Sequence, residues 1–208
     1  MKFYLSSYKL GNKVSKLQKM ISNSNRKIGY IPNALDFSGA DPIRREEGIK
    51  KEINELESLG FEPELLDLKN YFGKEKALKN RLENLGGVFI RGGNTFILRQ
   101  AMKLSGFDKL IKKLNKKEDF LYSGYSAGVC ILAPSLKPLQ IVDDPKDFPY
   151  KEIEKAIWKG LGILDYIILP HYKSDHPESK DIDKEIKYCK KNKIRFKPLK
   201  DGEVIIIE

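Results

Sequence analysis

Cysteine is scarce in this sequence, and its scarcity excludes several kinds of protein. The 208 residues include only two cysteines, Cys130 and Cys189, which lie far apart. This spacing excludes a disulfide framework and does not fit a zinc site, so we expect no bound metal. It suits a reducing compartment, and we expect a cytoplasmic protein. Cys130 lies within an apolar run, which predicts a buried thiol.

Long hydrophobic runs are also missing. No stretch approaches the roughly 20 apolar residues of a membrane span, so we expect no membrane partner. The N-terminal MKFYLSSYKL has neither a long apolar segment nor a cleavage site of small residues, and we expect no signal peptide. Apolar content is nevertheless close to that of globular proteins. The length then predicts a soluble chain that folds as one domain, residues 1–208.

Negative charge is in the minority, with 29 Asp and Glu against 39 Lys and Arg, and the net charge is +10. Such a balance raises the possibility of a nucleic-acid partner. The basic residues of 109–117, however, are interrupted by Leu110, Ile111 and Leu114, the pattern of a helix with one buried and one solvated face. There is no zinc-finger spacing and no aromatic RNA-binding signature. We therefore expect surface charge and no nucleic-acid binding.

Short apolar runs alternate with amphipathic stretches along the chain. The runs predict strands at 2–6, 27–33, 61–68, 86–90, 119–123, 166–170, 194–199 and 204–207. The amphipathic stretches predict helices at 13–22, 42–59, 74–84, 95–104, 107–117 and 179–191, and residues 134–150 predict a long loop. This alternation favours an α/β fold, a mostly parallel sheet with helices on both faces. Asp201-Gly202 predicts a C-terminal β-hairpin with an antiparallel edge.

The stretch Gly124-Tyr125-Ser126-Ala127-Gly128 joins an apolar strand to an apolar helix start. G-x-S-x-G in this position is the nucleophile-elbow pattern, in which a strained turn holds a serine above the sheet. The N–H of Ala127 would then help to bind an oxyanion. The alternative is a plain tight turn that needs small residues.

A nucleophilic serine needs a base, and the chain has only two histidines. His171 follows the predicted strand 166–170, so it falls at a strand end, as Ser126 does, and the two can meet. The alternative role of His171 is merely to cap that strand. His176 lies further into a polar loop, which predicts a surface histidine or the start of a helix. After another strand, Gly92-Gly93 can bring backbone N–H groups close to a ligand. An oxyanion is the favoured ligand, because the phosphate-binding glycine patterns are missing.

Three motifs together, GGNTF at 92–96, GYSAG at 124–128 and PHY at 170–172, resemble the peptidase E (aspartyl dipeptidase) family of serine peptidases, and the similarity extends to DGE at 201–203. The resemblance implies a fold like the class I glutamine amidotransferases, with serine in place of their cysteine. It implies hydrolysis of short peptides without a cofactor. It also implies a role for each site residue: Ser126 as nucleophile, His171 as base, Gly93 and Ala127 as oxyanion donors, and Gly92 as the residue that shapes the loop.

The identity of the third catalytic residue is open between two places in the sequence. The family carries a carboxylate before a glycine near the C-terminus, which here is Asp201, and we favour it. The alternative is the acidic pair Asp143-Asp144, of which Asp144 is the candidate. An ordinary Asp-Gly turn would also explain Asp201. Arg91 stands where relatives carry a further glycine, and it would either bind a substrate carboxylate or face solvent.

Three other functions remain open. The chain could be a cyanophycinase-like or other acyl hydrolase on the same fold, a catalytically inactive binding module, or a basic RNA-binding protein. The favoured partner is a small peptide substrate, and we expect a monomer or a homodimer.

Overall fold

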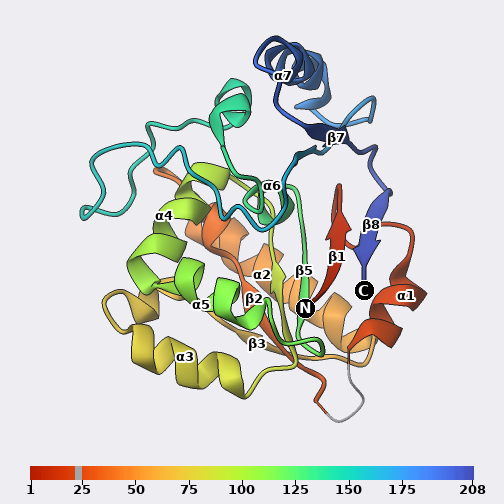
Figure 1. The fold of residues 1–208 in the computed structure, drawn as a ribbon. Helices are drawn as coiled ribbons and strands as arrows, with labels where there is room; N and C mark the ends of the chain where they lie inside the picture. Colours follow the sequence, from red (N-terminus) through yellow and green to blue (C-terminus); the bar gives the residue numbers. More distant parts are fainter. Residues whose placement is uncertain (22–24) are drawn as a thin grey trace.

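A six-stranded sheet forms the centre of the computed structural model, which describes residues 1–21 and 25–208 (Figure 1). Its strand order is β3-β2-β4-β5-β1-β8. The strands are β1 (Lys2–Ser6), β2 (Lys27–Ile31), β3 (Glu62–Leu65), β4 (Gly87–Ile90), β5 (Leu121–Tyr125) and β8 (Val204–Ile207). All neighbours pair in parallel except β8, which runs antiparallel to β1 at one edge.

Helices cover both faces of this sheet. The helices are α1 (Val14–Met20), α2 (Pro42–Ser58), α3 (Glu75–Glu83), α4 (Thr95–Ser105), α5 (Phe107–Leu114), α6 (Ala127–Cys130) and α7 (Ser179–Lys191). Short 3-10 helices lie at η1 (Asn33–Leu35), η2 (Leu68–Tyr71) and η3 (Lys137–Ile141). Apolar residues of α1 and α2 pack on one face of the sheet, and those of α3, α4 and α5 pack on the other. The predicted α/β fold is confirmed.

The predicted C-terminal hairpin is wrong, although its turn and its antiparallel edge are present. The turn closes with the N–H of Glu203 donating to the carbonyl of Lys200 at 2.9 Å. The strand before it, β7 (Phe196–Pro198), pairs in parallel with β6 (Ile167–Leu169) in a separate two-stranded sheet. The strand after it, β8, pairs with β1 instead. An Asp-Gly signal predicts the reversal of the chain, but the partner of each strand depends on which apolar faces it can bury.

Several predicted boundaries differ from the observed ones. The helix predicted at 107–117 ends at Leu114, and the strand predicted at 61–68 is limited to Glu62–Leu65. The helix predicted at 13–22 is α1, and residue 22 lies outside the described residues. The strand predicted at 119–123 instead occupies Leu121–Tyr125, because each of its residues pairs with one of β1. β5 therefore runs directly into Ser126.

The register of the central strands brings three loops to one edge of the sheet. Ser6 lies opposite Tyr125, and Ile90 lies opposite Gly124. The residues that follow β1, β4 and β5 therefore leave the sheet at the same level. In Figure 1, β7 lies beyond this carboxyl edge, above α6, and α7 lies further out at the top of the molecule. Chain segments far apart in sequence thus meet there.

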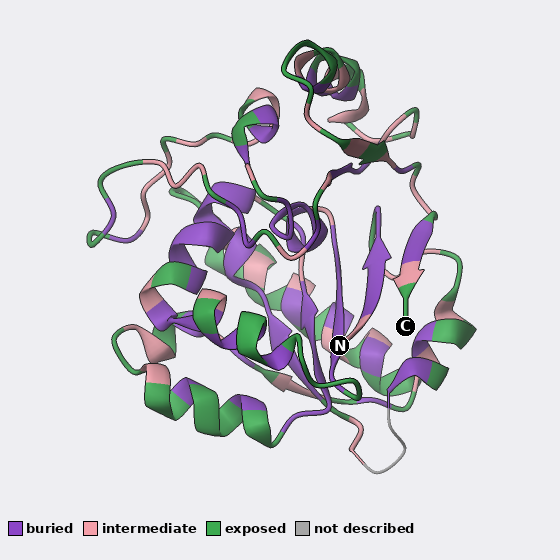
Figure 2. Ribbon diagram, in the orientation of Figure 1, coloured by how far each residue is buried: buried purple, intermediate pink, exposed green. Residues whose placement is uncertain are grey.

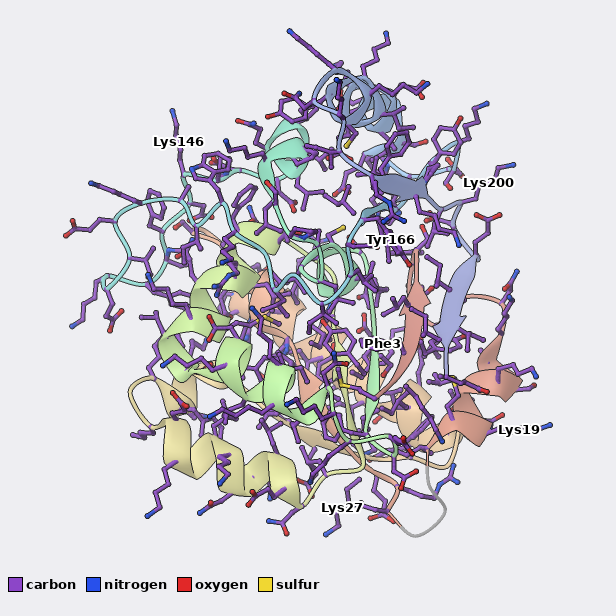
Figure 3. All side chains as sticks on the ribbon, viewed as in Figure 1. Phe3, Lys19, Lys27, Lys146, Tyr166 and Lys200 are labelled. Atoms are coloured by element: carbon purple, nitrogen blue, oxygen red, sulfur yellow. The ribbon has the colours of Figure 1, made fainter. Side chains whose placement is uncertain are left out.

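Buried residues fill the interior of the sheet, as Figure 2 shows in purple along the central strands. The net positive charge lies at the periphery: the exposed side chains of Lys19, Lys27, Lys146 and Lys200 project outward in Figure 3, whereas Phe3 lies inside. Among the helices that the structure describes, none is long and apolar enough to cross a membrane. Cys130 is buried, as predicted.

Candidate active site

Ser126 lies in a strained turn at the end of β5. Its φ is 47° and its ψ is −118°, a conformation that a residue with a side chain rarely adopts. The glycines on either side permit the turn: a Cβ on Gly124 or Gly128 would come within 2.5 Å or 2.3 Å of the carbonyl oxygen of Ile90. The turn therefore needs small residues, and it also leaves Ser126 half-buried, with a hydroxyl that makes no hydrogen bond to any described residue.

The Gly92-Gly93 loop packs directly against this turn. A Cβ on Gly92 would lie 2.9 Å from Cβ of Ser126, so only glycine allows this approach. Gly93 has a φ of 144°, which also requires glycine. Within the described part of the chain, the backbone N–H groups of Gly93 and Ala127 have no hydrogen-bond acceptor. Two free donors thus flank the serine, as an oxyanion site requires.

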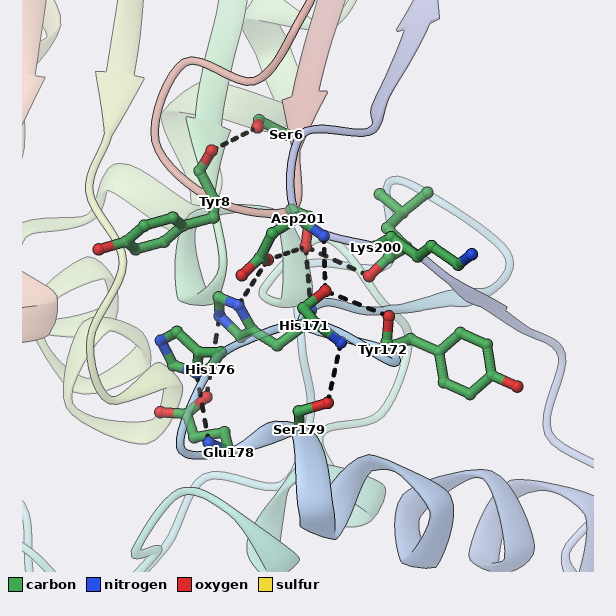
Figure 4. Close-up of polar contacts among 12 residues, drawn as sticks. Ser6, Tyr8, His171, Tyr172, His176, Glu178, Ser179, Lys200 and Asp201 are labelled. Carbon is green, nitrogen blue, oxygen red and sulfur yellow. Dashed lines mark hydrogen bonds and ion pairs between the residues drawn. The ribbon is translucent and has the colours of Figure 1, made fainter.

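His171 contacts Asp201 across the same edge. Its Nδ1 lies 2.8 Å from Oδ1 of Asp201 (Figure 4). The imidazole is buried, and its Nε2 lies 3.8 Å from Oε2 of Glu178. The backbone of His171 is also strained, with a φ of 60°. Because the carboxylate accepts the Nδ1 proton, Nε2 is the nitrogen left with a free lone pair.

Burial controls the ionisation of His171. Burial lowers the pKa of this histidine below its ordinary value and outweighs the carboxylate of Asp201, which raises it. The neighbouring His176 lowers the pKa further. The imidazole is therefore neutral at neutral pH and can accept a proton.

Ser7, which directly follows β1, forms hydrogen bonds with His171, Asp201 and Ser126. Its hydroxyl accepts the backbone N–H of His171 at 2.9 Å and donates to Oδ1 of Asp201 at 2.8 Å. Its carbonyl accepts the backbone N–H of Ser126 at 3.2 Å. Ser7 was not among the predicted site residues, although it too directly follows a strand, the feature that singled out Ser126 and His171.

The alternative acids lie elsewhere. Asp144 accepts the backbone N–H of Lys146 at 2.8 Å through its carboxylate, and its carbonyl accepts from the side chain of Asn94. Asp143 accepts the backbone N–H of Thr95 at 2.9 Å, and it lines a small cavity beside Ser126. Neither carboxylate bonds to His171, so Asp201 is the described carboxylate that orients the imidazole.

His176 stacks on His171, with ring centroids 3.7 Å apart and planes 10° from parallel. One ligand atom from each histidine and one from Glu178 lie within 4.8 Å of one another, which is close enough to consider a metal ion. The lone pairs of an imidazole lie in its ring plane, however, and those of two parallel rings do not converge on one point. A metal would require one ring to turn, so we do not assign a metal site here.

Arg91 does not simply face solvent, which was one of its two predicted roles, because its guanidinium contacts an acid inside the protein. Its Nε lies 3.4 Å from Oε1 of Glu52, an acid that also accepts the hydroxyls of Tyr30 and Tyr125. The guanidinium is mostly buried, and one side of it lines a cavity that also contains Arg44. Arg91 thus supports Tyr125, the residue directly before the serine.

Ser126 and His171 are brought to the same edge but do not form a hydrogen bond to each other. The ring of Tyr8 lies between their segments, with its centroid 5.7 Å from that of His171 and 6.0 Å from that of Tyr125. Catalytic hydrogen bonds are often long without substrate and shorten when it binds. The arrangement brings a serine hydroxyl, an imidazole oriented by a carboxylate and two free backbone N–H groups to one edge of the sheet.

Comparison with known proteins finds relatives among peptidases. The model of peptidase family S51 matches residues 6–208. An uncharacterized peptidase of Listeria monocytogenes is 33% identical over 152 residues, which cover 73% of this chain and 70% of that protein. A peptidase E of Streptomyces coelicolor is 33% identical over 100 residues, 48% of this chain and 37% of that protein.

Solved structures show the same fold. A crystal structure of a candidate peptidase E protein from Listeria monocytogenes superposes with a TM-score of 0.77 at 26% identity, covering 99% of this chain and 93% of that one. A peptidase from an acI-B1 Actinobacterium has a TM-score of 0.66 at 14% identity, with coverage of 100% and 83%. The predicted resemblance is confirmed: the chain belongs to peptidase family S51.

Proposed function

We propose that this peptidase is a serine peptidase that hydrolyses short peptides, as a dipeptidase or exopeptidase, with Ser126, His171 and Asp201 as its catalytic residues. The single observation that carries the proposal is the 2.8 Å contact between His171 Nδ1 and Asp201 Oδ1, at the edge where the strained Ser126 is held. An oriented, neutral histidine at the same edge as a half-buried serine hydroxyl without a hydrogen-bond partner among the described residues is an arrangement that can activate the serine.

The mechanism follows from these positions. Nε2 of His171 takes the proton of Ser126 while Oγ attacks the carbonyl carbon of the peptide bond. The resulting oxyanion accepts the N–H groups of Gly93 and Ala127, which no other described group occupies. The C–N bond then breaks, and the leaving amine takes the proton from His171. A water molecule, deprotonated by the same histidine, releases the acyl group and restores Ser126.

Replacement of Ser126 by alanine tests the proposal. We expect hydrolysis of a panel of Xaa-Yaa dipeptides, Asp-Yaa included, to fall by at least about a thousandfold, because little catalysis remains without the nucleophile. A fluorophosphonate should label the parent protein at Ser126 and leave the variant unlabelled. Unchanged dipeptide hydrolysis in the variant would refute the assignment, and a folded parent protein without labelling would favour a binding module.

A further inference from the structure

Glu52 is a buried acid that the proposed mechanism does not use. It lies on the buried stripe of α2, between Ile49 and Leu56, and it is only 8% exposed. Its carboxylate accepts two tyrosine hydroxyls, that of Tyr30 through Oε2 and that of Tyr125 through Oε1, each at 2.8 Å. Since a buried charge is unfavourable without partners, the groups around Glu52 are held close to it.

One oxygen of this carboxylate joins the ends of two strands. Tyr125 is the last residue of β5, and Arg91 directly follows β4. The Nε of Arg91 lies 3.4 Å from the same Oε1 that accepts the hydroxyl of Tyr125. Arg91 stands two residues before Gly93, one of the proposed oxyanion donors. Tyr125 stands two residues before Ala127, the other donor. Glu52 is thus connected to both halves of the proposed oxyanion site.

The helix α2 has a small residue where the guanidinium of Arg91 crosses it. Gly48 lies one turn before Glu52, and a Cβ there would come within 2.8 Å of Nη1 of Arg91. Glycine is unfavourable in the interior of a helix, so its presence at this position needs a reason. Here it leaves the space in which the arginine reaches the carboxylate.

The partners of Glu52 keep their protons at neutral pH. Burial raises the pKa of Tyr125 well above its ordinary value, and the charge of Glu52 raises it further. Burial raises the pKa of Tyr30 in the same way. Both phenols therefore donate, and Arg91 stays charged because a guanidinium does not lose its proton in proteins. The carboxylate accordingly accepts from the same groups while the enzyme works.

An oxyanion site depends on the distance between its two donors. Each N–H must lie about 2.7–3.1 Å from the same oxygen, so a shift of either loop weakens the site. The loop of Gly92 packs against the ring of Tyr125, since a Cβ on this glycine would lie 2.7 Å from that ring. This packing limits how closely the two loops approach, and the contact of Arg91 with Glu52 limits how far they separate.

We propose that Glu52 is a positioning residue that sets the distance between the proposed oxyanion donors, the N–H groups of Gly93 and Ala127. It acts through Arg91 on one side and through the hydroxyl of Tyr125 on the other. This inference rests on the proposed peptidase function, and it adds to that function a residue of α2.

Tyr30 provides an internal comparison, because it donates to the same carboxylate but lies in β2, away from the proposed site residues. Tyr125→Phe and Tyr30→Phe each remove one buried hydroxyl, so both should lower the urea midpoint of unfolding. We expect kcat on one dipeptide to fall by about 10- to 100-fold in Tyr125→Phe and by about twofold at most in Tyr30→Phe, because only the first change shifts the turn of Ser126. KM should change little in either variant. Equal losses of kcat would show that the carboxylate only stabilises the fold, and would overturn the inference.

Replacement of Glu52 tests the carboxylate itself. Glu52→Met keeps a side chain of similar length without its two acceptor oxygens and should lower kcat by about 10- to 100-fold. Glu52→Gln keeps one acceptor oxygen and should recover part of that loss. In the Tyr125→Phe background, Glu52→Met should cost less than in the parent, because changes at contacting residues are not additive. Glu57→Gln changes an exposed glutamate of the same helix and should behave like the parent. Unchanged kcat in Glu52→Met, or losses that multiply fully in the double variant, would overturn the inference.

Hydrogen–deuterium exchange separates this inference from the proposed function, because it needs no hydrolysis. Amide exchange over residues 91–95 and 125–129 should be at least about threefold faster in Tyr125→Phe than in Tyr30→Phe, since exchange reports the local opening of a segment. If the parent hydrolysed no peptide, the proposed function would fail, and faster exchange would still support the link from Glu52 to both loops. Equal exchange in the two variants would overturn the inference even if peptides were hydrolysed.

Discussion

The hydroxyl of Ser7 accepts the backbone N–H of His171 at 2.9 Å, across 164 residues of sequence, and donates to the carboxylate that His171 contacts. One side chain thus fixes the backbone of the proposed base and the rotamer of its acid. The carbonyl of the same residue holds the N–H of Ser126.

Ser7→Ala should lower kcat while KM stays close to that of the parent. A hydrogen bond to a charged group contributes about 1.5–3 kcal/mol, so we expect a loss of about 10- to 100-fold. Ser6→Ala is the matched control, because Ser6 is also buried at the end of β1 but donates to the carbonyl of Tyr8. Steady-state kinetics on one dipeptide would decide the point, and equal rates for the two variants would contradict it.

Asp201→Asn should abolish most activity, whereas Asp144→Asn should not. Asparagine would present a donor to Nδ1 of His171 and favour the wrong tautomer, and the same change in another serine peptidase lowers kcat by about 10⁴. Among the described residues, Asp144 forms hydrogen bonds with Lys146 and Asn94 and none with His171, so its variant should stay within about twofold of the parent, since surface changes have small effects. The opposite ranking of kcat values would place the acid at Asp144.

His176→Ala should move the acid limb of the pH profile to higher pH. His176 and burial both lower the pKa of His171, and removal of the stacked ring weakens both effects. The base is active only when neutral, so a raised pKa means that activity is lost at a higher pH as the solution is acidified. The measurement is kcat/KM against pH for both proteins. A limb that stayed fixed or moved to lower pH would show that the stack does not control the base.

Gly92→Ala should lower kcat by about 100-fold or more, because displacements near 1 Å at a reacting group have effects of this size. The new Cβ would lie 2.7 Å from the ring of Tyr125 and 2.9 Å from Cβ of Ser126, so the turn must shift. Gly73→Asn offers a control, since Gly73 has a positive φ that asparagine tolerates and nothing within 4 Å of its Cβ position. Comparable kcat values for the two variants would count against a role for this close packing.

The sequence predicted the parts of the site that follow strands. Ser126, His171 and Gly92-Gly93 all come directly after apolar runs, and parallel strands bring such positions to one edge. No pattern in the sequence predicted that β6 pairs with β7 in a separate sheet, because the partner of a parallel strand depends on packing between residues far apart in sequence.

The sequence does contain a signal for Glu185, which lines the small cavity beside Ser126, but that signal lies within the pattern that predicts an ordinary amphipathic helix. It lies between Ile182 and Cys189 on the buried stripe of α7, at helical spacing. A charged residue on an apolar stripe is unusual and indicates a special partner or environment. Its neighbours in the cavity, however, come from loops whose path the sequence does not specify.

The proposed catalytic residues are divided between the two sheets, so a movement of one sheet relative to the other would separate them. Nucleophile and oxyanion donors are attached to the large sheet, whereas His171 and Asp201 follow the two strands of the small one. The backbone N–H of Leu199 donates to Leu169 at 2.9 Å, which ties the segments carrying the base and the acid to each other. Any displacement of the small sheet would therefore carry a preassembled proton acceptor toward or away from the serine as one piece. Such a displacement would have to break the hydrogen bonds of Ser7 to His171 and Asp201, and that of Cys130 to the carbonyl of Ile168 in β6.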